Sequence, residues 1–219
     1  MKLQVIAGST RPTRAIDHVI PWVVSRAERH DAFDVEVLDL RDWPLPIFQE
    51  HMGTLGDFVD PPYSEPIVKR WNNKIAEADA YLIITPEYNH SIPAVLKNAI
   101  DSVFASFGFR NKPAAFVGYS GGVAAGTRAV EHLASIAIEV ELHPLKQSVL
   151  IPKVGNAFND NHDPIDPDTE TALEIVLDDL AWWASILTRA RSDGQLTPGV
   201  FRAREAAAAR AAAAVRDDE

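Results

Sequence analysis

The sequence predicts an α/β fold in which a five-stranded parallel sheet, in the order 2-1-3-4-5, carries helices on both faces. Segments typical of strands and of helices alternate along the chain. Residues 80–85 and 114–119 are continuous apolar runs, which is typical of parallel strands buried on both faces. The length of 219 residues suits one domain of ordinary size.

The first third of the chain alternates strand, helix and strand before a long connection. Residues 3–7 form an apolar run that ends at Gly-Ser-Thr, typical of a strand entering a βα turn. Residues 14–29 repeat apolar side chains on one helical face, and Pro21 predicts a kink or a split there. Residues 35–40 alternate as a strand. Residues 43–66 are rich in proline and glycine and predict an irregular connection of the length used for lids or interface segments.

The middle of the chain continues this alternation. We expect a helix over residues 65–78 and, after the strand at 80–85, a second helix from Pro93 to about Phe104. Proline suits the first position of a helix because its missing N–H would have no partner there. The strand at 114–119 follows.

The last elements are predicted from turn signals and periodicity. Gly121 and Gly122 lead into a helix through Ile138, and residues 140–145 are the fifth strand. A long helix starts at Pro167, after Asp166 as its cap. Five strands in this order are typical of a flavodoxin-like sheet.

The carboxyl-terminal segment differs in composition from the rest. Residues 201–215 are almost pure alanine with a few arginines, and an isolated helix of this length is marginal in water. We therefore expect a frayed helix or a disordered tail rather than a partner-binding helix. The predicted organisation is a flavodoxin-like domain over residues 1–192 and an alanine-rich tail, helical or disordered, over residues 193–219.

Composition excludes several classes of function. Lys plus Arg number 21 and Asp plus Glu 31, giving a net charge of −10, which argues against nucleic-acid or anionic-membrane surfaces. The absence of cysteine removes thiolate nucleophiles and Cys-ligated metal. No apolar run reaches the roughly 20 residues that span a bilayer, and the start does not resemble a signal peptide. We expect a cytoplasmic protein.

The turn after the first strand carries the clearest sign of a ligand. Ser9, Thr10 and Thr13 supply hydroxyls, Arg11 and Arg14 supply positive charge, and the following helix begins with unpaired amides. These groups together favour a phosphate site over simple helix capping, which needs only one hydroxyl. The Walker and dinucleotide-binding glycine patterns are both missing here.

Two further turns follow the third and fourth strands. Pro86, Glu87, Tyr88 and Asn89 combine backbone amides with an aromatic face and can hold a flat heterocycle, or form an ordinary turn. In the second of these turns, adjacent glycines let the backbone approach a ligand closely, although taken alone this turn is better explained as a simple βα turn. That turn contains Ser120, Gly121 and Gly122.

The three turns together resemble the NADPH-dependent FMN reductases, a flavodoxin-like family of quinone, azo-dye and chromate reductases. The resemblance rests on residues 8–14, 85–101 and 120–122 and spans roughly residues 1–190. It implies FMN as cofactor, NADPH or NADH as hydride donor, and a small-molecule electron acceptor. It also implies a homodimer or homotetramer with flavin near the subunit interface.

The resemblance further implies a role for each turn. Ser9, Arg11 and Thr13 would hold the FMN phosphate. Residues 86–89 would line the isoalloxazine ring, largely through backbone, and residues 120–122 would meet its pyrimidine edge. A flavin performs the hydride chemistry itself, so no catalytic base, nucleophile or metal site is expected.

Two alternatives stay open from the sequence. One is a non-catalytic electron-transfer or flavin-binding module like a flavodoxin. The other is a protein that has lost flavin binding and acts through its alanine-rich tail. The acidic segment 159–168 is interpreted as a solvated loop and helix cap because it lacks the spacing of a calcium loop.

Overall fold

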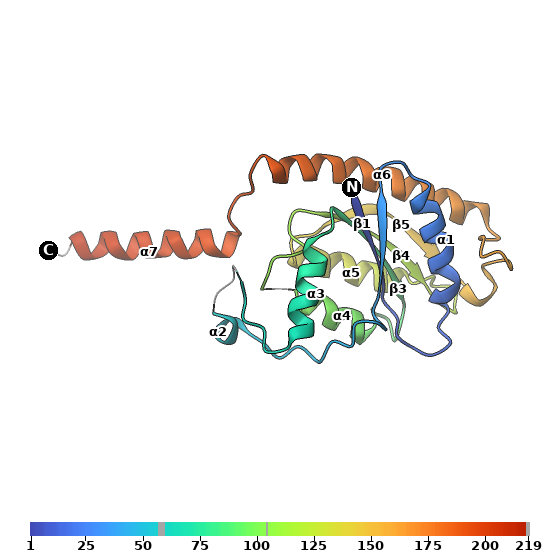
Figure 1. Ribbon diagram of the computed structural model, residues 1–219, viewed down its shortest axis with the longest axis horizontal. Coiled ribbons are helices and arrows are strands. Elements are labelled where there is room, and N and C mark those ends of the chain that lie inside the picture. Colours follow the sequence, from blue (N-terminus) through green and yellow to red (C-terminus); the bar gives the residue numbers. More distant parts are fainter. Residues whose placement is uncertain (57–59, 104, 218–219) are drawn as a thin grey trace. The chain divides into compact units, whose positions relative to one another are not determined.

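The computed structural model describes residues 1–56, 60–103 and 105–217, and its centre is one parallel β-sheet. The strands lie in the order β2-β1-β3-β4-β5, all neighbours parallel, as predicted (Figure 1). Their bounds are β1 Lys2–Ala7, β2 Asp34–Asp39, β3 Ala80–Pro86, β4 Pro113–Tyr119 and β5 His143–Ile151.

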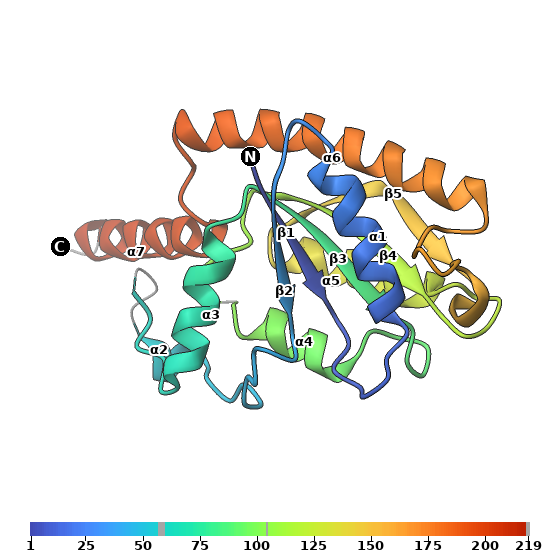
Figure 2. The ribbon, with the colours of Figure 1, turned by 45° about the vertical axis from the view of Figure 1, so that its right-hand side comes forward.

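Helices cover both faces of this sheet, which Figure 2 shows. Apolar side chains of α1 and α6 form one core with the sheet, and those of α3, α4 and α5 form the second core on the opposite face. The helix bounds are α1 Ile16–Glu28, α2 Met52–Leu55, α3 Pro66–Ala76, α4 Ala94–Asp101, α5 Thr127–Glu139, the 3₁₀ turn η1 Val154–Asn156, α6 Pro167–Ser192 and α7 Gly199–Asp217.

The period-two geometry of the strands divides their side chains between the two cores. In β1, Val5 and Ala7 pack toward α1 and α6, while Ile6 packs toward α3 and α4. Every residue of β3 and of β4 is buried. Continuous apolar runs therefore predict the two central strands correctly, because neither face of those strands meets solvent.

Several element bounds differ from the sequence-based expectations. Helix α1 runs unbroken past Pro21. The fifth strand begins three residues later than predicted and continues to Ile151, because its edge position allows exposed Lys146 and Gln147 within it. Helix α5 begins at Thr127 rather than directly after the glycine pair. Helix α4 ends at Asp101, and Phe104, near which the helix from Pro93 was predicted to end, lies outside the described residues.

The chain divides into two compact units, Met1–Thr188 and Arg189–Glu219. The first contains the whole sheet. The second contains the end of α6 and the helix α7, so the alanine-rich segment is helical rather than irregular. No helix in the described part of the chain is both long and apolar enough to cross a membrane.

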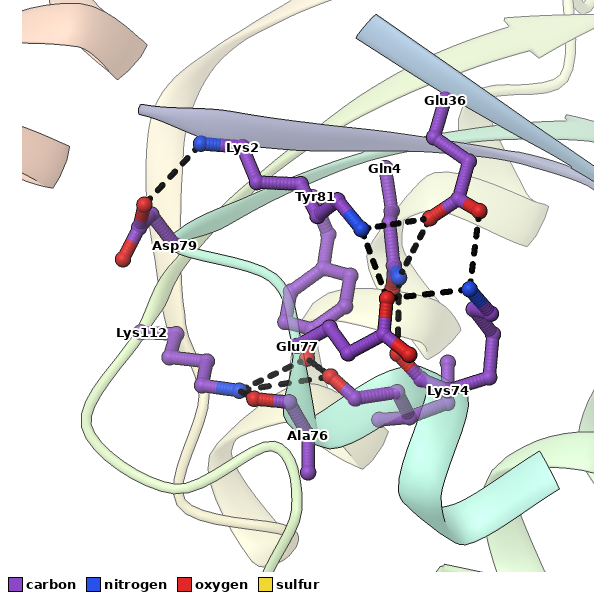
Figure 3. A network of polar contacts seen from close by, with 10 residues as sticks. Lys2, Gln4, Glu36, Lys74, Ala76, Glu77, Asp79, Tyr81 and Lys112 are labelled. Carbon is purple, nitrogen blue, oxygen red and sulfur yellow. Dashed lines mark hydrogen bonds and ion pairs between the residues drawn. The ribbon is translucent and has the colours of Figure 1, made fainter. Parts of the chain in front are cut away.

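A polar network lies at the amino-terminal edge of the sheet, on the side opposite the turns considered below (Figure 3). Gln4, fully buried in β1, donates through Nε2 to Glu36 and to the Lys74 carbonyl at the end of α3. Burial opposes ionisation of Glu36, but hydrogen bonds from Lys74, Gln4 and Lys2 lower its pKa below the usual value.

Lys112 belongs to the same network, and its side chain caps the carboxyl-terminal end of α3. Its Nζ donates to the Ala76 carbonyl at 2.9 Å and to the Ile75 carbonyl at 3.3 Å. The side chain is buried with only 6% of the residue exposed, and it also contacts the Tyr81 hydroxyl at 3.2 Å. A lysine here replaces the hydrogen bonds that the last carbonyls of a helix lack.

Replacing this lysine with an apolar residue of similar length tests its contribution. We expect Lys112→Met to lower the free energy of unfolding by about 2 kcal/mol, because buried carbonyls lose a charged donor. The measurement is chemical denaturation followed by circular dichroism. Lys146→Met, at an exposed lysine, is the control. Equal stability of the two variants would contradict the role given to Lys112.

Candidate functional site

The three turns singled out in the sequence lie next to one another at the carboxyl edge of the sheet. They are the first loop (residues 8–15), after β1, the second loop (87–93), after β3, and the third loop (120–126), after β4. Strands β1, β3 and β4 are adjacent and parallel, so their carboxyl ends meet at one edge. Ligands of open parallel sheets bind at this edge.

Most backbone N–H groups of the first loop have no hydrogen-bond acceptor among the described residues. Gly8 N–H donates to the Ile84 carbonyl at 2.9 Å, and a Cβ at Gly8 would lie 2.8 Å from that oxygen. Beyond this point a run of amides finds no acceptor within the described residues, namely those of Ser9, Thr10, Arg11, Thr13, Arg14, Ala15 and Ile16. Unpaired amides before a helix attract anions.

Arg14 differs from the role expected for it. Its side chain is only 1% exposed, and its guanidinium bonds to the Ser9 carbonyl, to both oxygens of Asp39 and to Asp17. The guanidinium therefore supports the first loop from behind and faces carboxylates, not a ligand. The sequence could not show this, since an arginine in a turn can point outward or inward.

Asp39, at the end of β2, is the residue that sequence reasoning missed. Burial opposes its ionisation, but hydrogen bonds from Arg14 and from the backbone and side chain of Arg41 lower its pKa to about 2. Arg14 and Arg41 each form ion pairs with Asp17 and with Asp39, so these four charges neutralise one another. Arg11 has no acidic partner in the described part of the chain, so it supplies the uncompensated positive charge of the first loop.

Arg11 and Tyr88 connect the first loop to the second. The Arg11 guanidinium lies 3.6 Å from the Tyr88 ring centroid, and the Tyr88 hydroxyl lies 2.8 Å from the Ser9 hydroxyl. A cation over an aromatic face is attracted by the ring quadrupole. One face of Tyr88, predicted to cover a heterocycle, is therefore covered by Arg11, and Ser9 is fully buried beneath it.

The second loop carries unusual backbone angles. Asn89 and His90 have φ values of 49° and 77°, in the left-handed region that side chains other than glycine rarely adopt. Tyr88 and Ser91 exchange two backbone hydrogen bonds across this turn. The amides of Asn89 and His90 have no acceptor among the described residues. Pro86, the last residue of β3, is buried.

The Glu87 side chain turns away from this exposed backbone. Its carboxylate is 4% exposed and forms an ion pair with Arg128 at the start of α5. Glu87 can thus contribute only backbone to a ligand here. Arg128 is a second residue that sequence reasoning did not select, because nothing in the sequence pairs positions 41 residues apart.

The third loop is open on its outer side. The Ser120 hydroxyl donates to the Gly122 carbonyl at 3.0 Å, and the amides of Gly121 and Gly122 have no acceptor in the described chain. A Cβ built at either glycine would meet nothing within 4 Å. Gly126, with φ of 85°, could not be another residue, since a Cβ there would lie 2.4 Å from the Tyr119 amide nitrogen.

Residues 1–156 match the model of the NADPH-dependent FMN reductase family. The chain is a member of that family. It is 34% identical over 155 residues to an NAD(P)H-dependent FMN reductase of Schizosaccharomyces pombe, covering 69% of this chain and 74% of the relative. A 2-hydroxy-1,4-benzoquinone reductase of Burkholderia sp is 28% identical, covering 84% and 96%.

Solved structures agree on the fold. The flavoenzyme NAD(P)H:acceptor oxidoreductase FerB of Paracoccus denitrificans superposes with a TM-score of 0.66 at 23% identity, covering 84% of this chain and 97% of FerB. An azoreductase of Bacillus anthracis superposes with a TM-score of 0.54 at 21% identity, covering 84% and 98%. As a family member, the protein is an oxidoreductase that works with FMN and NAD(P)H.

The residues of this FMN reductase fit the flavin phosphate in one specific respect. The Tyr119 hydroxyl, at the end of β4, is buried and has no hydrogen-bond partner among the described residues. Burial and then neighbouring Tyr88 raise the pKa of Tyr119. Its position as the last residue of β4 places it at the same sheet edge as the first loop. An unpaired donor and a run of free amides at one place suit an anion.

A pocket of about 370 Å³ opens beside the first loop of the reductase. Its walls are largely apolar and come from the connection after β2 and from α4. Asn98 of α4 holds this connection, since it donates to the Pro46 carbonyl and accepts from the Phe48 amide. The lining residues are Thr10, Leu40, Arg41, Trp43, Pro44, Leu45, Ile47, Ala94, Val95 and Asn98.

Removing the Asp39 charge tests the support of the first loop. We expect Asp39→Asn to lower the free energy of unfolding by about 2 kcal/mol at neutral pH. The folded-state pKa lies below the unfolded one. The charge therefore stabilises above about pH 4, and this stabilisation is lost as pH falls toward 2.

The measurement is urea denaturation of both proteins from pH 7 to pH 2.5, with exposed Asp42→Asn as the control. The stability gap between wild type and Asp39→Asn should narrow at the acid end. A gap that stays constant across this range would show that the Asp39 charge is not what stabilises the loop.

Proposed function

We propose that the protein passes electrons from NAD(P)H through FMN to quinones, azo compounds or similar electrophilic acceptors, in two alternating half-reactions at one site. The observation that carries this is the meeting of three loops with unpaired amides at one sheet edge. When bound, the flavin accepts hydride at N5 and passes electrons on. The protein has to bind, orient and shield.

Each loop has its own part in this proposal. The first loop holds the phosphate through Arg11 and its amides, that of Ser9 included, with Thr10 and Thr13 as further donors. Pro86 at the end of β3 and residues 87–89 of the second loop line the ring, largely through their backbone. The third loop meets the polar edge of the ring through Ser120, Gly121 and Gly122. Arg14 and Glu87 support these loops through their side chains.

The pocket beside Thr10 supports an acceptor that is flat and mainly apolar. Trp43, Leu45 and Val95 give it apolar walls. A flat ring system that binds between such walls is removed from water, which favours binding through the hydrophobic effect. The Burkholderia relative is named a 2-hydroxy-1,4-benzoquinone reductase, which fits an acceptor of this class.

The assembly we propose is a homodimer or homotetramer in the cytoplasm, where NAD(P)H is available. Support for an oligomer comes from large apolar side chains left exposed on α6. Trp182 and Trp183 are 58% and 42% exposed and pack edge to face, with ring centroids 4.9 Å apart. Size-exclusion chromatography with light scattering tests this, and a monomer at micromolar concentration would refute it.

The experiment that tests the function is an anaerobic absorption spectrum of the purified protein. FMN is added first and NADPH second. Bound flavin that bleaches within seconds, and regains colour on adding a benzoquinone, supports the proposal. Flavin that binds but does not bleach with NADPH or NADH would indicate an electron-transfer module instead.

Loss of Arg11 tests the phosphate site. We expect Arg11→Ala to weaken FMN binding by about 1.5–3 kcal/mol, because the loop loses its uncompensated charge. The measurement is quenching of FMN fluorescence on titration with apoprotein. Arg70→Ala, which removes an exposed arginine from α3, is the matched control. Affinity equal to that of the control would remove Arg11 from the site.

Truncation tests the independence of the first unit. We expect a chain ending at Pro198 to keep its rate of flavin reduction, because all three loops belong to residues 1–188. Stopped-flow absorbance with NADPH measures this rate. Lost reduction in a truncated protein that still unfolds at the wild-type midpoint of chemical denaturation would mean that α7 helps to form the site.

A further inference from the structure

The second loop is fastened to α5 at two points. Near the start of the loop, the Glu87 carboxylate pairs with the Arg128 guanidinium and accepts the Arg128 backbone N–H at 3.3 Å. Near its end, the Ser91 hydroxyl lies 2.9 Å from Nδ1 of His132. Arg128 and His132 are four residues apart in α5, so they lie on the same face of the helix.

The turn between Glu87 and Ser91 has a strained backbone that the surrounding structure must keep in place. Asn89 and His90 adopt the left-handed backbone region, which is costly for residues other than glycine and persists only where the surroundings impose it. Two backbone hydrogen bonds, from Tyr88 N–H to the Ser91 carbonyl at 2.9 Å and in return at 3.1 Å, close the turn. They do not connect it to the rest of the protein, whereas Arg128 and His132 do.

The fastening at Glu87 is the stronger by its chemistry. Its carboxylate is almost completely buried, and α5 directs the positive end of its dipole and a backbone N–H at it. The Glu87 amide also donates to the Tyr119 carbonyl at 3.0 Å, which joins the second loop to the end of β4. Removing Arg128 would leave a buried charge without its cation, an arrangement that strongly disfavours the native geometry.

We propose that Arg128 and His132 are positioning residues for flavin binding. They act through Glu87 and Ser91, and they hold the turn so that the unpaired amides of Asn89 and His90 face the ligand. This inference rests on the proposed function, because it assigns a use to the strained turn. It gives α5, which carries none of the site residues predicted from sequence, control over the second loop.

The first test is FMN affinity, measured by fluorescence quenching. We expect Arg128→Ala to weaken binding roughly tenfold, with a changed visible circular-dichroism spectrum of the bound flavin. Adding Glu87→Gln to that variant should restore most of the affinity. The neutral amide needs no cation, and it still accepts the backbone N–H at position 128. Arg70→Ala is the control for loss of an exposed arginine.

The second test needs no flavin. In the ligand-free protein, hydrogen exchange of the Tyr88 and Ser91 amides should become faster in Arg128→Ala and in His132→Ala, while the Ile83 amide in β3 stays unchanged. Because His132 is exposed, its variant should fold even if Arg128→Ala does not.

The outcomes separate the two proposals. Wild-type exchange in His132→Ala and in Arg128→Ala would overturn the positioning role. Faster exchange with wild-type FMN affinity and spectrum would also overturn it, because the fastenings would then be structural only. A wild-type protein that binds no FMN would refute the proposed function, and the exchange rates would still decide whether α5 holds the turn.

Discussion

The parallel pairing of β1, β3 and β4 is the constraint on which the rest of the site depends. Three segments separated by about 80 and 30 residues come together because their strands end at the same edge of one sheet. None of the loops forms a ligand site by itself. Each offers a few unpaired amides, and only their adjacency gives a surface large enough for a heterocycle with a phosphate.

Most charged side chains at this edge of the sheet are paired with one another, whereas Arg11 has no acidic partner among the described residues. Arg14, Arg41, Asp17 and Asp39 neutralise one another behind the first loop, and Glu87 and Arg128 do the same behind the second. In each group one side chain, that of Arg14 or of Glu87, is almost fully buried, so the loss of its partner would leave a buried charge unpaired. Because these charges are paired with one another, Arg11 is the arginine of the first loop whose charge is available to a ligand.

Much of the fold could be predicted from the sequence, and less of the site. The runs at 80–85 and 114–119 identify central strands because burial on both faces demands unbroken apolar residues. The fifth strand was misplaced because an edge strand tolerates polar residues such as Lys146. The unpaired amides of the site could be predicted, because the sequence shows where the loops after the strands lie. The orientations of the Arg14 and Glu87 side chains could not be predicted, because they depend on ion pairs with Asp39 and Arg128, which are distant in sequence.

The free amides of the first loop have one more consequence. An amide is a neutral dipole, and its attraction for an anion does not change with pH. The guanidinium of Arg11 also keeps its charge across the physiological range. An anion held there is therefore held by groups that do not titrate. Any pH dependence of its affinity near neutrality should then report the second ionisation of the phosphate itself, so the ligand, rather than the protein, would act as the acid–base component of binding.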